Sequence, residues 1–285
     1  MLVLMACLVL SQSKQVVLDA VGDVMLGRNV GKRIAREGLE SVSKGIREEL
    51  TRADLALGNL ECAITSAPFV MSKRFLLRAD PSKVGALKRF GFTALSLANN
   101  HSGDCGNVGV LETQSKLRSI GTVPVGPQLD PIILERNGLK IGVLGILDLP
   151  THWESNSVLP IALKRLRSKV DVVVVMVHWG HEGSHSLEAT QVSLATKLAG
   201  LGVDLVLGSH PHVLQPVHWV KGADGHRCLV AFSLGNFVFD APAGDQRLSM
   251  ILSVKLGTHG VEQFKVVPVR IDRGYPQLGS VDFLL

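Results

Sequence analysis

Residues 203–212 read VDLVLGSHPH. The apolar run ends at Leu207, and a short polar loop then carries His210 and His212 on either side of Pro211. An apolar run of this length that stops at a glycine-containing loop is typical of a buried strand. Both imidazoles are metal-ligand types, and the proline between them stiffens their link. The stretch therefore predicts a strand that presents possible metal ligands from its carboxyl end.

Four other apolar runs end in the same way, each followed by a polar side chain that could bind a metal. The runs and the residues after them are 16–21 with Asp23, 53–57 with Glu61, 92–97 with Asn100, and 170–177 with His178. Ligands of α/β proteins bind at the carboxyl ends of the strands. The repetition of this pattern therefore predicts one shared ligand site.

Helix-like stretches separate these strands, at residues 31–50, 82–89, 109–120, 160–169 and 189–199. From Leu229 onward the pattern indicates strands and turns, with no convincing helix. Buried strands that alternate with helices predict a layered α/β fold. Because no repeat, linker or low-complexity stretch interrupts the chain, we expect a single domain over residues 16–285.

The composition excludes several classes of protein. Of the 285 residues, 46% are apolar and 19% are charged, which predicts a substantial core and excludes a disordered chain. The net charge of +5 favours anionic partners only mildly. With a single tyrosine and no aromatic residues among the basic ones, a nucleic-acid groove is not expected.

The cysteines and the first residues carry weaker signals. Cys7, Cys62, Cys105 and Cys228 lie too far apart for a zinc ribbon or a redox motif, so we expect small buried residues. Residues 1–10 are apolar but too short to span a bilayer, and residues 1–15 could form a signal or leader segment. With a signal the protein would be exported or bound to the cell envelope. Otherwise it would be cytoplasmic, with these residues as a first strand or a mis-assigned start.

The residue types at the strand ends suit one kind of chemistry. Carboxylate, amide oxygen and imidazole are ligands for Mn²⁺, Fe, Zn²⁺ or Mg²⁺. One or two such ions can polarise a phosphoryl group and activate water, while a nearby histidine protonates the leaving oxygen. The pattern therefore indicates metal-assisted hydrolysis of an anionic substrate.

Six motifs resemble the calcineurin-like metallophosphoesterase superfamily and, within it, the CapA/PgsA branch of capsule and poly-γ-glutamate biosynthesis. The motifs are Gly22 to Arg28, Gly58 to Glu61, Ala98 to Ser102, His178 to Glu182, Gly208 to Pro216, and Ser233 to Asp240. They occur in the order of that family and cover roughly residues 16–240. The resemblance implies a four-layer α-β-β-α sandwich. It also implies a role in capsule or poly-γ-glutamate production, on a phosphorylated or polyanionic substrate and alongside membrane-bound synthase subunits.

The resemblance also implies a role for each site residue. The implied metal ligands are Asp23 for metal one, Glu61 as the bridge, Asn100 and His178 for metal two, and His210 and His212 for one metal each. His101 would be the general acid, oriented by Asp104. Residues expected around the substrate are Arg28, Asn59, Glu182 and Asn236.

The sequence departs from the superfamily at Met25, which stands where the first motif usually has a histidine. Metal one then loses a nitrogen ligand, so the sequence is compatible with either one or two bound metals. Met25→His would restore that ligand and is expected to raise the affinity for metal one. The alternative to an enzyme is a non-catalytic, metal-stabilised accessory subunit of a membrane-bound polymer synthase.

Overall fold

A computed structural model describes residues 14–149, 158–240 and 244–280 of the chain. The predicted leader segment, residues 1–15, lies outside this part except for Lys14 and Gln15. Among the described residues, no helix combines the length and the apolar character needed to cross a membrane.

The first sheet is built around β1, which pairs in parallel with β2 and in antiparallel with β14. Its strand order is β16-β15-β14-β1-β2-β5-β6, and β13 pairs with the end of β1. Its strands are β1 (Val16–Val24), β2 (Leu55–Leu60), β5 (Ala94–Ser96), β6 (Val123–Val125), β13 (Asn236–Val238), β14 (Leu248–Gly257), β15 (Gly260–Asp272) and β16 (Tyr275–Leu278). Because β1, β2, β5 and β6 are parallel, their carboxyl ends share one edge of the sheet.

The second sheet has the order β11-β12-β10-β9-β8-β7, with four parallel strands in the middle and an antiparallel strand at each edge. Its strands are β7 (Ile132–Arg136), β8 (Leu139–Asp148), β9 (Val172–Trp179), β10 (Leu205–Ser209), β11 (Val217–Lys221) and β12 (Arg227–Ala231). A separate short pair consists of β3 (Ala63–Ile64) and β4 (Arg78–Ala79).

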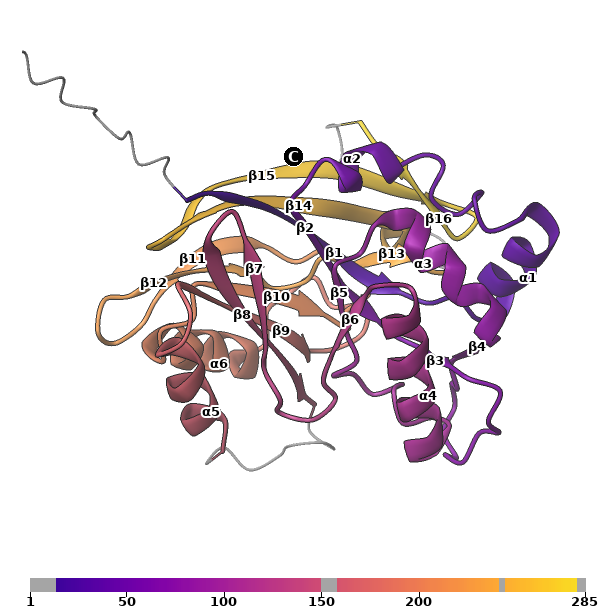
Figure 1. The fold of residues 1–285 in the computed structure, drawn as a ribbon, viewed down its shortest axis with the longest axis horizontal. Coiled ribbons are helices and arrows are strands. Elements are labelled where there is room, and N and C mark those ends of the chain that lie inside the picture. The colour runs from indigo at the N-terminus through magenta and orange to yellow at the C-terminus, as the bar shows by residue number, and fades with distance from the viewer. Residues whose placement is uncertain (1–13, 150–157, 241–243, 281–285) are drawn as a thin grey trace, which may run out of the picture.

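The two sheets lie face to face, and helices cover their outer faces (Figure 1). Outside the first sheet lie α1 (Arg28–Glu37), α2 (Arg47–Thr51), α3 (Val84–Phe90) and α4 (Gly106–Ser119). Outside the second sheet lie α5 (Val158–Arg167) and α6 (Ala189–Gly200). Two 3₁₀ turns occupy Pro81–Lys83 and Gly244–Arg247. The chain thus forms the four-layer α-β-β-α sandwich predicted from the sequence.

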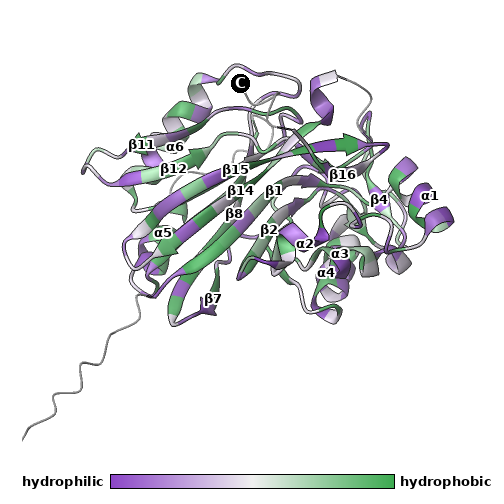
Figure 2. Ribbon diagram, turned by 90° about the horizontal axis from the view of Figure 1, so that it is seen from above, coloured by the Kyte–Doolittle hydropathy of each residue, from purple (hydrophilic) through white to green (hydrophobic). Residues whose placement is uncertain are grey.

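Three apolar clusters match the three interfaces between these layers. The middle cluster joins side chains of both sheets, for example Leu18 and Leu57 of the first and Val174 and Leu207 of the second. The outer clusters join each sheet to its helices. Hydrophobic residues accordingly run along the central strands β14, β1 and β8 (Figure 2). The described cysteines, Cys62, Cys105 and Cys228, are buried and free, as expected.

Several elements differ from the sequence-based prediction, among them the strands β6, β7 and β11, which no predicted apolar run covers. The single helix expected over residues 31–50 is two helices, because α1 ends at Glu37, directly before Gly38, whose φ of 86° lies outside the helical region. Strand β8, buried along most of its length, was not predicted. It lies between the edge strand β7 and β9, and it completes the parallel core of the second sheet.

Candidate metal centre

The carboxyl ends of the parallel strands of both sheets meet in one buried cluster. Asp23 closes β1, Glu61 follows β2, Asn100 and His101 follow β5, His178 lies on β9, and His210 and His212 follow β10. The two sheets therefore supply opposite walls of the cluster. All of the residues predicted as metal ligands are brought together here.

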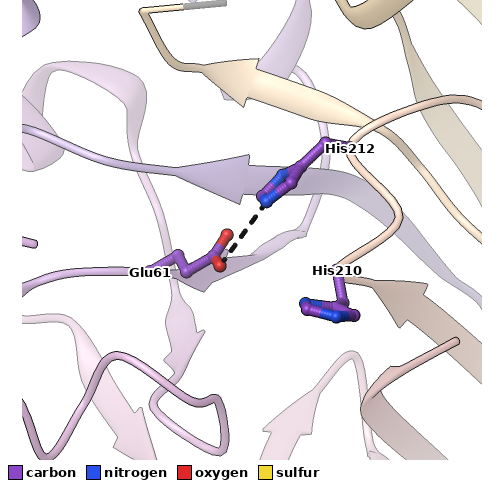
Figure 3. A group of neighbouring side chains, drawn as sticks. All are labelled: Glu61, His210 and His212. Atoms are coloured by element: carbon purple, nitrogen blue, oxygen red, sulfur yellow. Dashed lines mark ion pairs between the residues drawn. The ribbon is translucent and has the colours of Figure 1, made fainter. Parts of the chain in front are cut away.

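Glu61 lies at the centre of the cluster and has no exposed surface. Its Oε1 lies 3.6 Å from His178 Nε2, 3.8 Å from His212 Nε2 and 3.9 Å from His101 Nε2. Neither carboxylate oxygen has a hydrogen-bond partner among the described residues. Figure 3 shows the Glu61 carboxylate facing the two imidazoles of the loop after β10. A buried carboxylate without hydrogen bonds is costly unless a cation lies beside it.

The loop after β10 holds its two histidines in an uncommon backbone conformation. His210 has a φ of 96° and His212 a φ of 58°, both in the region that side chains rarely adopt. The backbone N–H of His210 donates to Asp23 Oδ2 at 3.3 Å, which ties this loop to the first sheet. The strain is thus located at the residues that face Glu61.

His178 and His210 form the side of the cluster that belongs to the second sheet. Their ring centroids lie 4.6 Å apart. His178 Nε2 lies 2.9 Å from Asn100 Oδ1, and its Nδ1 lies 3.0 Å from Ser209 Oγ. Nδ1 also lies 3.3 Å from Asn59 Nδ2, so its role depends on the tautomer. In the tautomer whose Nδ1–H donates a hydrogen bond to Ser209 Oγ, Nε2 keeps its lone pair for a metal, the usual arrangement for a ligating histidine. His210 Nδ1 is buried without a hydrogen-bond partner in the described part of the chain.

Asp23 and His212 form the other side of the cluster, and hydrogen bonds within the protein already satisfy both Asp23 oxygens and His212 Nδ1. Asn59 Nδ2 donates to Asp23 Oδ1 at 2.8 Å, and His212 Nδ1 lies 3.2 Å from Asp23 Oδ2. His212 Nδ1 also lies 2.9 Å from Asn236 Oδ1. Asn236 Nδ2 donates to the carbonyls of His212 and Gln246, so its oxygen is the atom left to face the ring. These contacts make Asn236 an orienting partner of His212.

Two glycines allow this close approach of the strand ends. A Cβ at Gly22 would lie 1.8 Å from the carbonyl oxygen of Gly235, next to the hydrogen bond from Asp23 N to that same oxygen. A Cβ at Gly208 would lie 2.0 Å from the carbonyl oxygen of Phe232. Only glycine fits at either position, which explains why both candidate motifs begin with it.

The cluster shifts the pKa values of its members in opposite directions. Burial raises the pKa of Glu61 well above its ordinary value, and the Asp23 carboxylate raises it further. Burial alone would lower the pKa of His212, but the carboxylates of Glu61 and Asp23 raise it to about 10. Burial and the neighbouring His212 lower the pKa of His210 to about 4, and burial lowers that of His178 strongly. His178 and His210 are therefore neutral near pH 7, as metal ligands must be.

His101 is held by a second chain of contacts at the edge of the cluster. Its Nδ1 donates to Asp104 Oδ2 at 2.9 Å, which leaves Nε2 facing Glu61. Burial would raise the pKa of Asp104, but hydrogen bonds from His101 and Lys73 lower it, so the carboxylate stays ionised. Lys73 Nζ lies 2.5 Å from Asp104 Oδ1 and donates to the carbonyl of Asn100 at 2.6 Å. Asp104 thus stands where the sequence predicted an orienting carboxylate.

Arg28 and Glu182 lie outside the buried cluster. The Arg28 side chain is 44% exposed, and its Nε lies 3.3 Å from Asp240 Oδ2. Glu182 is exposed on the loop after β9, where its charge raises the pKa of Glu61 and of His212. Asn59 is buried between Asp23, Asn99 and His178, with hydrogen bonds on both ends of its amide.

Met25 packs away from the cluster. Its side chain is fully buried in the apolar cluster between the first sheet and its helices, and its Sδ accepts a hydrogen bond from Gly27 N at 3.0 Å. A histidine at this position would enter the apolar core. The geometry therefore argues against the expectation that Met25→His tightens metal one.

The donor set fits a divalent cation. Donor atoms of Glu61, His210 and His212 all lie within 4.8 Å of one another, and His178 Nε2 lies beside the same Glu61 oxygen. Carboxylate and imidazole are the ligands that borderline divalent ions prefer, and His212, whose pKa of about 10 keeps it protonated in the metal-free protein, would release its proton on binding the ion. A cation at this position would also satisfy the unpaired oxygens of Glu61, which no described side chain does.

The sequence reasoning missed Lys73 and Ser209. Lys73 stands in a loop whose side chains are mostly exposed, and its contact with Asp104 spans 31 positions of the chain, so no local pattern identifies it. Ser209 could have been found, because it lies directly before His210 at the end of a predicted strand. Its hydroxyl is the atom that fixes the His178 ring.

Comparison with known proteins places this geometry in a family. The family described as "Bacterial capsule synthesis protein PGA_cap" matches residues 17–241. The chain is 30% identical to the PGA biosynthesis protein CapA of Bacillus subtilis (strain 168) over 277 residues, which cover 90% of this chain and 72% of that one. It is 29% identical to the capsule biosynthesis protein CapA of Bacillus anthracis, over 93% of this chain and 70% of that one.

A solved structure supports the fold alone. A hypothetical protein from Thermus thermophilus matches with a TM-score of 0.54 and 19% identity, over 90% of this chain and all of that one. The family match contains every residue of the strand-end cluster, from Asp23 to Asn236, which confirms the resemblance stated from the motifs. The chain belongs to the bacterial capsule synthesis protein family PGA_cap.

Proposed function

We propose that this chain is a divalent-metal-dependent hydrolase of the phosphoesterase type, acting on a phosphorylated or polyanionic substrate in capsule or poly-γ-glutamate production. The observation that carries the proposal is the buried Glu61 carboxylate, which has no hydrogen-bond partner in the described part of the chain and has three imidazole nitrogens within 3.9 Å. The production context is supported by the family and by the names of the two Bacillus relatives.

The ligands divide between two positions around Glu61. We assign Glu61, Asn100, His178 and His210 to the first ion and Asp23, Glu61 and His212 to the second. His212 also lies close enough to Glu61 and His210 to reach the first ion. When bound, a divalent ion polarises a phosphoryl group and lowers the pKa of water. The neutral state of His178 and His210 leaves their lone pairs available for this purpose.

His101 would supply the proton in this scheme. Asp104 accepts the Nδ1 proton and fixes the ring, so Nε2 is the atom that can hold a proton near the cluster and release it to a leaving oxygen. Arg28, partly exposed beside Phe75, would contact an anionic substrate at the rim. This places one cationic group outside the cluster and the acid at its edge.

The test is metal content together with turnover of a generic phosphodiester. The purified full chain, loaded with Mn²⁺ and desalted, should retain metal and hydrolyse bis(p-nitrophenyl) phosphate. Chelation should abolish the turnover, and Glu135→Gln, an exposed carboxylate on the edge strand β7, should leave it unchanged. Retained metal without turnover of any phosphodiester or phosphomonoester would contradict a hydrolase.

A specific observation favours the accessory-subunit alternative. Both Asp23 oxygens already have protein partners and Met25 lies in the core, so the second metal position is short of free donors. A single structural ion would then hold the strand ends together without chemistry. In the native host, His101→Ala, which should keep the ion, should stop polymer production if hydrolysis is required, whereas production that continues without detectable turnover would favour the accessory subunit.

A further inference from the structure

The segment between β3 and β4 exposes an unusual number of large apolar side chains. Phe69 is 40% exposed, Val70 62%, Met71 49% and Phe75 47%. Helix α4 adds Val108 and Leu111, and Val70 N donates to the carbonyl of Asp104, just before that helix begins. Apolar side chains gathered on one face mark an interaction surface. We call residues 66–76, which connect β3 to β4, the docking loop. It lies beside α4 in Figure 1.

Cationic side chains share this surface with the apolar ones. Lys73, Arg74 and Arg78 lie in or next to the docking loop, and residues 62–79 contain no aspartate or glutamate. The guanidinium of Arg74 lies 5.0 Å from the centre of the Phe75 ring, and that of Arg78 lies 4.8 Å from the centre of the Phe69 ring. The charges and the rings therefore form one surface rather than two separate patches.

The docking loop is attached to the rim of the candidate metal centre. Lys73 of this loop contacts the Asn100 carbonyl and the Asp104 carboxylate, which in turn holds His101. Whatever binds the exposed side of the loop therefore lies next to the His101 edge of the cluster. This position gives the surface a functional meaning beyond an isolated apolar patch.

We propose that the docking loop inserts its apolar side chains into a membrane surface that carries anionic lipids. Such an interface offers an apolar layer for Phe69, Val70 and Met71 directly beneath negatively charged headgroups, which suit the exposed Arg74. An acidic polymer would pair with the cations but would leave the apolar side chains in water. A symmetric contact with a second copy of the chain would bring like charges together, which opposes association. The metal centre would then face the bilayer.

Helix α5 provides a demanding control, because it also combines exposed apolar and basic side chains. Val158 and Ile161 are exposed there, and so are Lys164 and Arg165. This helix covers the outer face of the second sheet, remote from β3 and β4 (Figure 1). Ile161→Ser with Arg165→Ser therefore matches the loop variant Met71→Ser with Arg74→Ser in chemistry but not in position.

The experiment is co-sedimentation of the full chain with lipid vesicles. The protein should bind vesicles of phosphatidylcholine with one third phosphatidylglycerol, bind pure phosphatidylcholine more weakly, and lose binding as salt is raised. The loop double variant should weaken binding by about fivefold or more, since each cation near an anionic surface contributes about that factor. The α5 double variant should bind as the parent does, and thermal melting checks that both variants fold.

The other outcomes overturn the proposal. Parent protein that does not bind anionic vesicles, or a folded loop variant that binds as the parent does, excludes docking through this loop. Parent protein that is dimeric in light scattering and becomes monomeric in the loop variant assigns the surface to a second copy. If the double variant does not fold, Arg74→Glu alone keeps every apolar side chain and should still weaken binding. The assay needs no hydrolysis, so it is independent of the proposed function.

Discussion

The two halves of the strand-end cluster are built from similar residues but are satisfied in different ways. In the Asp23 half, both carboxylate oxygens have protein partners, and His212 is bracketed by Asp23 and Asn236. In the Glu61 half, neither carboxylate oxygen has a hydrogen-bond partner among the described residues, and His210 Nδ1 has none either. A buried carboxylate in this state is stabilised by taking up a proton, as the raised pKa of Glu61 indicates, or by binding a cation, whereas a paired one is already stabilised.

The first ion therefore belongs beside Glu61. The Glu61 half offers neutral imidazoles and an unpaired carboxylate, so an ion there gains contacts without breaking existing ones. At the Asp23 half, an ion must first displace hydrogen bonds from Asn59 and His212. We therefore expect one tightly bound ion near Glu61 and a weaker second position near Asp23.

Glu61→Gln should have the largest effect on metal binding and turnover. The amide brings one neutral oxygen in place of a shared negative charge, so the tight ion should be lost and any metal-dependent turnover with it. Metal analysis after desalting and phosphodiester turnover measure both effects. Glu135→Gln is the matched control, and retention of the ion in Glu61→Gln would place the shared ligand elsewhere.

His101→Ala should separate chemistry from metal binding. Because His101 contacts Asp104 and only faces Glu61 at 3.9 Å, the variant should keep its metal and lose about 10²–10⁴-fold in turnover. A substrate with an activated leaving group, which needs no proton, should recover much of that loss. Metal that disappears together with turnover would make His101 a ligand.

Ser209→Ala and Asn236→Ala compare the two halves through the partners that orient their histidines. Ser209 contacts His178 Nδ1 and Asn236 contacts His212 Nδ1. Loss of such an orienting partner lowers metal affinity about 10–100-fold. Competition with a metal-sensitive dye should show this loss at the tight ion for Ser209→Ala, and at the weaker position for Asn236→Ala. If both variants lowered the affinity for the same ion equally, the two halves of the cluster would form a single metal site.

Met25→His should change the least at the metal centre. The side chain is buried in the apolar core, and the imidazole would replace a thioether that accepts a hydrogen bond from Gly27. We expect no gain of metal and a loss of about 1–3 kcal/mol of stability, the usual effect of a polar group placed in a core. Urea unfolding and metal titration check the two parts, and a tighter second ion would show that residue 25 reaches the cluster.

The sequence predicted the ligand set because parallel strands impose a simple rule. Asp23, Glu61, Asn100, His178 and His210 each follow an apolar run, and parallel packing brings those ends together. The rule says nothing about hydrogen bonds across the fold. Asn59 donates a hydrogen bond to Asp23, and Asn236 contacts His212. Both contacts join segments that lie far apart in the sequence.

Contacts made by loop residues could not be predicted from the sequence patterns. Lys73 reaches Asp104 only because the docking loop folds back along the start of α4, and no periodicity marks that path. The orientation of Met25 into the core was hidden as well, since a residue directly after a strand can turn either way. The break after α1 had a visible signal, Gly38, within the stretch interpreted as one helix.

Titration of the metal-free full chain with Mn²⁺, followed by isothermal calorimetry, tests the asymmetry of the cluster most directly. We predict one ion that binds tightly and is lost in Glu61→Gln, and a second that binds at least about tenfold more weakly, because its donors are already hydrogen-bonded. Two ions of equal affinity, or a single ion that still binds to Glu61→Gln, would contradict the assignment of the tight ion to the Glu61 half of the cluster.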